Sequence, residues 1–196
     1  MAARTFVALE LSRPLRAGIL RLAETLKARG VRASWSKDDT LHLTLKFLGD
    51  VEEADLPEVI EAVRRAARDV PPFSFTSGGV GAFPSARRPR VIWVGVEATE
   101  ALLGLQAEVD RELAALGFPR EERRWTPHVT VGRIRDPQGS SGFDATLASL
   151  RCPEETVDVN EVLVMKSTLA PGGAIHEAVA RIRLTKPDPG KSPLSG

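Results

Sequence analysis

Two short strings in this chain pair a histidine with a threonine two residues later: Leu41-His42-Leu43-Thr44-Leu45 and Pro127-His128-Val129-Thr130-Val131. In a β-strand, side chains two residues apart project from the same face. Each string therefore predicts an imidazole beside a hydroxyl, with the aliphatic neighbours facing a core. Imidazoles exchange protons near neutral pH, and hydroxyls donate hydrogen bonds to anions. The two strings together indicate a two-histidine site for a phosphate group.

The composition narrows the classes of protein to which the chain can belong. A chain of 196 residues with 42% apolar and 27% charged residues is typical of a globular protein. A net charge of +1 excludes a polybasic nucleic-acid coat, so an anionic ligand must be bound by a local cluster of groups. The single Cys152 excludes an internal disulfide, and paired Cys/His zinc spacing is absent. Without a signal segment or a long apolar run, we expect a cytoplasmic protein.

The first half of the chain alternates strand-like and helix-like segments. Apolar spacing of three and four residues marks the helices, and short aliphatic runs mark the strands. The predicted elements are a strand over Thr5–Leu11, a helix over Leu15–Leu26 capped by Ser12 and stopped by Gly30, the His42 strand to Leu48, a helix over Asp55–Val70, a strand from Phe73, a bend at Gly78, Gly79 and Gly81, and a strand over Val91–Val96.

The second half has the same mixture of segments. The predicted elements are a helix over Thr99–Leu116, the His128 strand, a loop over Asp136–Thr146, and strands over Thr156–Lys166 and Ile175–Leu184 joined by a turn at Pro171-Gly172-Gly173.

This order of elements lacks the strict alternation of a parallel doubly wound sheet. The sequence predicts an α+β fold with two related lobes, in which two mostly antiparallel sheets flank a central groove and helices lie outside. We expect one bilobal domain over residues 1–185. The polar, proline-rich residues 186–196 predict a disordered tail.

Several further strings carry a family resemblance that runs along nearly the whole chain up to Leu184. Beside the two histidine strings, they are Arg4-Thr5-Phe6-Val7-Ala8-Leu9, Lys46-Phe47-Leu48-Gly49, Gly79-Val80-Gly81-Ala82-Phe83-Pro84, Pro89-Arg90-Val91-Ile92-Trp93-Val94-Gly95, Gly132-Arg133 and Ser167-Thr168-Leu169. In these strings the chain resembles the 2H phosphoesterases, most closely the 2′-5′ RNA ligases that are also called RNA 2′,3′-cyclic phosphodiesterases. One departure is His176, where the family usually has a tyrosine.

The resemblance implies a pseudo-twofold fold whose two HxT strands line one groove. Two-histidine chemistry needs no metal or cofactor, and the sequence offers no carboxylate or Cys/His cluster that would bind a metal. The resemblance also implies hydrolysis of RNA 2′,3′-cyclic phosphate ends to a 2′-phosphate, with reversible, ATP-independent 2′-5′ ligation. Such a reaction needs one group to take the proton of the nucleophile and another to protonate the leaving oxygen. We assign His128 as general base toward water and His42 as general acid. The symmetry of the halves leaves this direction a hypothesis.

Other residues have both a binding and a structural interpretation. Thr44 and Thr130 are expected to bind phosphate oxygens, although threonine also favours strands. Arg133 resembles the family's arginine five residues after the second histidine, but strict alternation puts it on the opposite face, so a bulge must redirect it. Lys46 shares the parity of His42 and either reaches the groove or is solvated.

The remaining candidates could contact RNA or serve the fold. Arginines in one turn can follow an RNA backbone or can be plain solvated surface. Aromatic side chains can stack on a base or pack, and packing is the stronger interpretation for Phe47. His176 is interpreted as structural or exposed. The candidates for RNA contact are the arginines Arg87, Arg88 and Arg90 and the aromatic residues Trp125 and Phe47.

Two other functions remain open from the sequence. One is a 2H phosphoesterase that acts on small cyclic nucleotides or 2′-5′ oligoadenylates. The other is a non-catalytic module that keeps the fold and binds RNA or nucleotides. The structural alternative for His42 and His128 is a pair of partly buried histidines hydrogen-bonded inside a sheet. We expect a monomer without membrane association.

Overall fold

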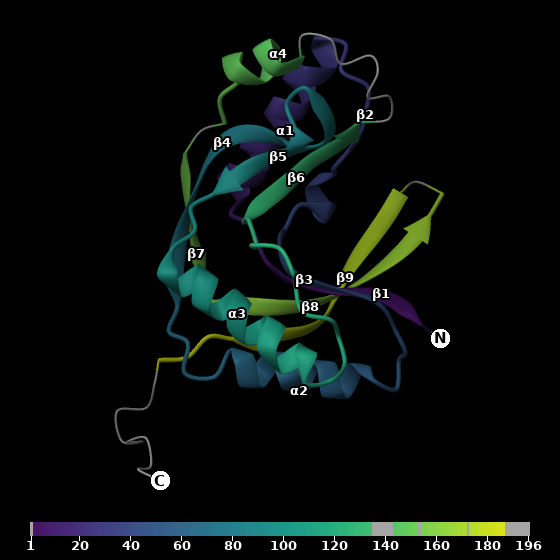
Figure 1. Cartoon of the computed structure of the whole chain (residues 1–196), viewed down its shortest axis with the longest axis vertical. Helices are drawn as coiled ribbons and strands as arrows, with labels where there is room; N and C mark the ends of the chain where they lie inside the picture. Colours follow the sequence, from purple (N-terminus) through teal and green to yellow (C-terminus); the bar gives the residue numbers. More distant parts are fainter. Residues whose placement is uncertain (1, 135–142, 153, 172, 187–196) are drawn as a thin grey trace.

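The computed structural model describes residues 2–134, 143–152, 154–171 and 173–186, which form two lobes around two sheets (Figure 1). The first sheet is four-stranded and the second is five-stranded, and every described strand pairing is antiparallel. The first sheet has the order β3 (Leu43–Val51), β1 (Ala3–Leu9), β8 (Glu161–Ala170), β9 (Gly173–Arg183). The second has the order β2 (Ala33–Trp35), β6 (His128–Ile134), β5 (Arg88–Val96), β4 (Phe73–Ser85), β7 (Glu155–Val159). The predicted bilobal α+β fold is confirmed.

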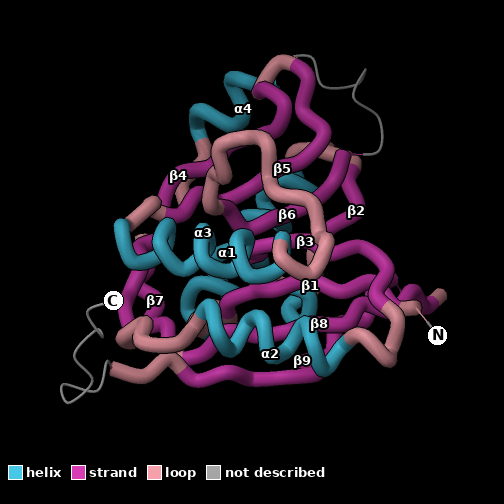
Figure 2. The backbone as a smooth tube through the Cα atoms, turned by 60° about the horizontal axis from the view of Figure 1, so that its bottom comes forward, coloured by secondary structure: helices cyan, strands magenta, loops and turns pink. Residues whose placement is uncertain are grey.

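Helices cover both sheets. Helices α2 (Leu56–Ala66) and α3 (Glu100–Ala114) pack on each other and contact the first sheet, and α3 also contacts β4 of the second sheet. Helix α1 (Arg13–Ala28) contacts β6 and β7 of the second sheet, and α4 (Phe143–Ser149) contacts β4. Helices α2 and α4 lie at opposite ends of the molecule in both views (Figures 1 and 2). None of the described helices combines the length and apolar character that a bilayer crossing requires.

The first helix forms as its sequence predicts. The hydroxyl of Ser12 accepts a hydrogen bond from the amide of Leu15 at 3.3 Å, which caps the start of α1. Ile19, Leu22 and Leu26 follow at helical spacing and are buried in the core. The chain thus places an apolar stripe of α1 against the second sheet.

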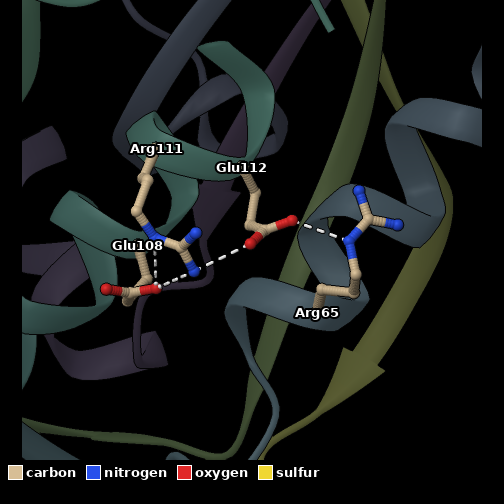
Figure 3. Close-up of polar contacts among 4 residues, drawn as sticks. All are labelled: Arg65, Glu108, Arg111 and Glu112. Atoms are coloured by element: carbon tan, nitrogen blue, oxygen red, sulfur yellow. Dashed lines mark hydrogen bonds and ion pairs between the residues drawn. The ribbon is translucent and has the colours of Figure 1, made fainter. Parts of the chain in front are cut away.

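An ion-pair network joins α2 to α3 (Figure 3). The carboxylate of Glu112 lies between two guanidinium groups, at 2.6 Å from Nε of Arg65 and 2.8 Å from Arg111. Arg111 also pairs with Glu108 at 2.7 Å. The hydrogen bond from Arg65 lowers the pKa of Glu112. The Glu112 side chain is only 12% exposed, whereas Arg65 and Arg111 are 44% and 56% exposed, so solvent screens these pairs in part.

The predicted bend at Gly78, Gly79 and Gly81 is wrong, because β4 continues through these glycines as one strand. Its partner β5 carries Trp93, whose indole lies directly over Gly81. A Cβ atom added to Gly81 would lie 2.2 Å from the indole. Gly81 therefore leaves space for the indole of Trp93 on the neighbouring strand, and it does not form a turn in β4.

The predicted strand over Thr156–Lys166 is also divided. It ends as β7 in the second sheet and restarts as β8 in the first, with only Asn160 between them. Hydrophobic periodicity alone does not reveal this change of sheet, because both parts bury valines in a core.

Two smaller differences concern short elements. The short strand β2 had no predicted counterpart. The predicted loop over Asp136–Thr146 is helical from Phe143, because Phe143 and Leu147 are buried together on one face of α4. Residues 135–142 of that loop and residues 187–196 of the predicted tail lie outside the described residues.

The ends of β8 and β9 form a two-stranded ribbon that rises away from the first sheet (Figure 1, right). This ribbon reaches the short 3₁₀ helix η1 (Asp38–Thr40), which immediately precedes the His42 string. At its tip, a Cβ atom on Gly173 would lie 3.8 Å from Nζ of Lys37. The ribbon therefore brings β9 residues close to the first histidine.

Candidate active site

The two histidine strings lie on strands of different sheets that contact each other. His42 directly precedes β3 in the first sheet, and His128 begins β6 in the second. Strands β3 and β6 are in contact across the two sheets. His42 and Thr44 are half-buried between fully buried leucines, and His128 and Thr130 alternate in the same way with buried valines. The predicted pairing of imidazole and hydroxyl on one face is confirmed for both strings.

The two imidazoles are oriented by the same local hydrogen bond. Nδ1 of His42 lies 2.7 Å from the carbonyl oxygen of Thr40, and Nδ1 of His128 lies 2.8 Å from that of Thr126. A carbonyl oxygen can only accept, so each Nδ1 carries a hydrogen and donates. In the neutral rings this leaves a lone pair on Nε2, the atom that is available for proton transfer.

This hydrogen bond defines a longer repeat than the sequence analysis recognised. Each string extends to Thr-x-His-x-Thr, with Thr40 in the first copy and Thr126 in the second. The backbone of the leading threonine fixes the tautomer of the histidine. The signal that could have revealed it was the threonine two residues before each histidine.

Aromatic rings pack against both imidazoles. Phe6 of β1 stacks on His42 with ring centroids 4.6 Å apart. Phe83 of β4 meets the edge of His128 at 4.9 Å, and Trp93 lies 6.4 Å from the same ring. Each histidine is thus held between a backbone carbonyl on one side and an aromatic ring on another.

The surroundings make both histidines weaker bases than free imidazole. Burial, with a smaller contribution from nearby His176, lowers the pKa of His42 to about 4. Burial and the positive charge of Arg133 also lower the pKa of His128. In the free protein, His42 is therefore neutral at pH 7. A ring that is neutral at pH 7 is able to accept a proton, whereas the sequence interpretation assigned His42 as the general acid.

A bulge in β3 reverses the expected positions of Lys46 and Phe47. Strand pairing with β1 matches Thr44 to Ala8 but Lys46 to Val7, so Leu45 is an extra residue. Beyond this bulge, Lys46 turns to the helix side, where its ammonium group donates to Asp110 at 2.5 Å and to the carbonyl of Pro119 at 2.6 Å. Lys46 is 8% exposed, so its predicted role in RNA binding is wrong.

The same bulge places Phe47 on the face of the histidine. Phe47 is 67% exposed, and its ring lies 5.9 Å from that of Phe6, which stacks on His42. The expectation that packing best explains this residue is therefore wrong. An exposed aromatic ring in this position is suited to stack on a nucleobase.

A bulge in β6 turns Arg133 to the face of His128, as the interpretation of the sequence required. Thr130 pairs with Trp93 and Arg133 pairs with Val91, so Val131 is the extra residue. Arg133 therefore shares the face of His128 and Thr130. Its guanidinium is close enough to affect the pKa of His128.

The other candidates for RNA contact lie at the edge of this region. Trp125 is half-buried and packs against the core three residues before His128. Arg87 lies in the turn between β4 and β5, and Arg88 and Arg90 lie at the start of β5. All three arginines are exposed. Within the described ranges, no three His, Cys, Asp or Glu side chains gather as metal ligands would.

Comparison with known proteins gives a match to one family over both halves of the chain. The family described as LigT-like phosphoesterase matches residues 9–93 and again residues 94–176, so each match contains one Thr-x-His-x-Thr string. An RNA 2′,3′-cyclic phosphodiesterase from Methanothermobacter thermautotrophicus is 36% identical, over 94% of this chain and 100% of the relative. Another from Thermotoga maritima is 35% identical, over 90% of this chain and 92% of the relative.

Solved structures share the architecture. A protein from Thermus thermophilus matches with a TM-score of 0.76 and 26% identity, over 93% of this chain and 98% of that chain. E. coli LigT in its apo form matches with a TM-score of 0.75, over 94% of this chain and 99% of that chain. At 23% identity, the second likeness concerns the fold alone.

Proposed function

Because the chain belongs to the LigT-like phosphoesterase family, we propose that it is an RNA 2′,3′-cyclic phosphodiesterase that leaves a 2′-phosphate. The observation that carries the proposal is the repeated orientation of His42 and His128. Each ring is held through Nδ1 by a backbone carbonyl, which leaves Nε2 for the substrate. The names of the relatives from Methanothermobacter and Thermotoga support the same reaction.

In the proposed mechanism, the cyclic phosphate binds between the two rings. One imidazole takes the proton of an attacking water, and the new P–O bond forms as the bond from phosphorus to O3′ breaks. The other imidazole gives its proton to O3′, so the proton count balances. When the 5′-hydroxyl of an RNA attacks in place of water, the same steps join two RNAs by a 2′-5′ bond without ATP.

The phosphate oxygens need partners that hold negative charge. We assign this role to the hydroxyls of Thr44 and Thr130 and to the guanidinium of Arg133, which share a face with their histidines. Among the described residues, neither threonine hydroxyl has a hydrogen-bond partner that would compete. Donors that are already oriented stabilise the charge that grows on the phosphorane oxygens.

The direct test is incubation with a short RNA that ends in a 2′,3′-cyclic phosphate. We expect a single product with the phosphate on O2′, mapped by its resistance to enzymes that require a 3′-phosphate. Comparison with a 2′,3′-cyclic mononucleotide separates an RNA enzyme from one that acts on small nucleotides. Binding of the RNA without turnover would indicate a non-catalytic module instead.

The dependence of rate on pH follows from the lowered pKa values. The active form needs one protonated and one neutral imidazole, and each ring gains its proton only as pH falls through its own pKa. With the pKa of His42 at about 4 and that of His128 also lowered, this form is most abundant on the acidic side of about pH 6.5. We therefore expect a bell-shaped profile of kcat/KM with an acidic optimum.

In the bound complex, the negative phosphate raises the pKa of both rings, so the profile of kcat should lie at higher pH than that of kcat/KM. Steady-state rates at constant ionic strength give both profiles. A kcat/KM that rises steadily into the alkaline range would contradict two-imidazole catalysis.

Arg133 provides a prediction for the phosphate contacts. Replacing Arg133 with Ala should raise KM by about 10-fold or more, as expected for a lost hydrogen bond to a charged group. The same change should raise the pKa of His128, because a repelling positive charge is removed. Arg183→Ala is the matched control, since Arg183 is an exposed arginine at the far end of β9. Equal KM values for the two variants would remove Arg133 from the site.

We also propose that the enzyme acts as a cytoplasmic monomer. All the groups assigned to the reaction come from one chain, with each sheet supplying one histidine and one threonine. No second subunit is needed to complete the site. The thiol of Cys152 is free and buried, which suits a reducing compartment.

A further inference from the structure

A third imidazole, that of His176 on β9, lies against the first histidine. Its ring centroid is 5.1 Å from that of His42 and 5.0 Å from that of Phe6, and it meets both rings edge-on, at 64° and 68°. Strand pairing places His176 opposite Ser167, in the row that also contains Arg4. His176 therefore shares the sheet face of Phe6.

A structural hydrogen bond does not explain this histidine. Its Nδ1 is buried and has no hydrogen-bond partner among the described residues. Buried polar atoms in native proteins are nearly always paired, and an exception calls for a functional or structural reason. Phenylalanine or tyrosine would fill the same space without leaving a ring nitrogen unpaired. The contact that distinguishes His176 is its approach to His42.

The charged groups around the pair come from several elements. Burial lowers the pKa of His176, and the carboxylate of Asp39 on η1 partly opposes this shift. Asp38 is engaged by Arg16 at 3.7 Å, and Arg4 lies in the same row on β1. The neighbouring Glu177 of β9 points to the opposite face of the strand by alternation.

We propose that His176 is a positioning residue for His42, which holds the His42 ring against Phe6 and competes with it for a single proton. Two imidazolium rings in contact repel each other, so protonation of one disfavours protonation of the other. Asp39 favours the proton on His176. His176 thereby sets the pH range over which His42 exchanges its proton with substrate. The catalytic part of this inference rests on the proposed function, whereas the proton competition does not.

The test uses the fact that the chain has three histidines, which give three separate imidazole signals in NMR. In the His176→Phe variant, a ring remains but the competing charge is lost. We expect the titration midpoint of His42 to rise by about half a pH unit or more. The acidic limb of the kcat/KM profile should move upward by the same amount, with the maximal rate kept within about threefold.

A second variant tests the packing. His176→Ala removes the ring, and we expect kcat/KM at the optimum to fall about 10-fold, because small displacements of a reacting group are costly. His176→Phe should restore most of that loss. The control is Ile175→Ala, which changes an exposed residue on the opposite face of the same ribbon and should alter neither the titration nor the rate.

An unchanged midpoint for His42 in His176→Phe would overturn the proton competition. A normal rate in His176→Ala would overturn the positioning role. If the wild-type protein turned over no cyclic phosphate at all, the proposed function would fail, but the NMR titration would still decide whether the two rings compete.

Discussion

Replacing either His42 or His128 with Ala is expected to lower the rate on a cyclic-phosphate RNA by a factor on the order of 10²–10⁴. Each variant loses a proton-transfer group that its backbone partner, Thr40 or Thr126, had oriented. Single-turnover measurements on the RNA give the loss without interference from product release. Circular dichroism establishes that the fold is intact, together with an unchanged His128 signal in His42→Ala and unchanged His42 and His176 signals in His128→Ala. Added imidazole should restore part of the rate by occupying the space beside Phe6 or Phe83.

The same variants can decide which ring is the acid. A substrate with sulfur in place of O3′ needs no protonation of its leaving group, so it should rescue only the variant that lacks the acid. Rescue of His42→Ala would support the direction assigned from the sequence. Rescue of His128→Ala would support the opposite direction, in which His42 is the base. Near-normal turnover by either single variant would contradict two-histidine catalysis.

The second large effect concerns stability. Lys46→Met is expected to lower the free energy of unfolding by about 3–5 kcal/mol, because it leaves the carboxylate of Asp110 without its buried partner. The side chains of Lys46 and Asp110 are only 6% and 14% exposed. Lys46 also donates to the carbonyl of Pro119, and Asp110 accepts from the amide of Glu121. The loss therefore also loosens the segment that leads to the His128 strand.

Urea unfolding measures this loss, and Lys27→Met is its matched control. Lys27 pairs with Glu24 at 2.6 Å, but both side chains are largely exposed. Its loss should cost less than about 1 kcal/mol. In the folded fraction of Lys46→Met, the salt dependence of KM should stay that of the wild type, since this lysine makes no phosphate contact. A weaker salt dependence would return Lys46 to the RNA-binding surface.

The elements that the sequence predicts well are those whose signal is local. Helix α1 follows from Ser12 and a regular apolar stripe, and the shared faces of the two histidine strings follow from strict alternation. The split at Asn160 does not follow, because β7 and β8 look alike residue by residue and differ only in the strands with which they pair. The glycines of β4 indicate a bend in the sequence, whereas the structure shows that Gly81 leaves space for the indole of Trp93.

In the candidate site too, the sequence predicts positions correctly only where the strand alternation is regular. His42, Thr44, His128 and Thr130 are recognisable because each pair lies before the bulge in its strand. Beyond the bulges, parity no longer predicts the face: Lys46 and Phe47 exchange positions in β3. Only the resemblance to a family suggested that Arg133 is redirected. The contact between His176 and His42 forms because the ends of β8 and β9 bring distant residues together. The residues next to His176 in the sequence do not predict it.

The chain passes several times between the two sheets, so each sheet is built from strands of both halves of the sequence. The two family matches divide the chain at residue 93, yet this boundary does not separate the lobes. Each matched segment contains strands from both sheets, and neither segment contains all the strands of one sheet. The strands that carry the two histidines therefore belong to different sheets, and they meet where β3 contacts β6.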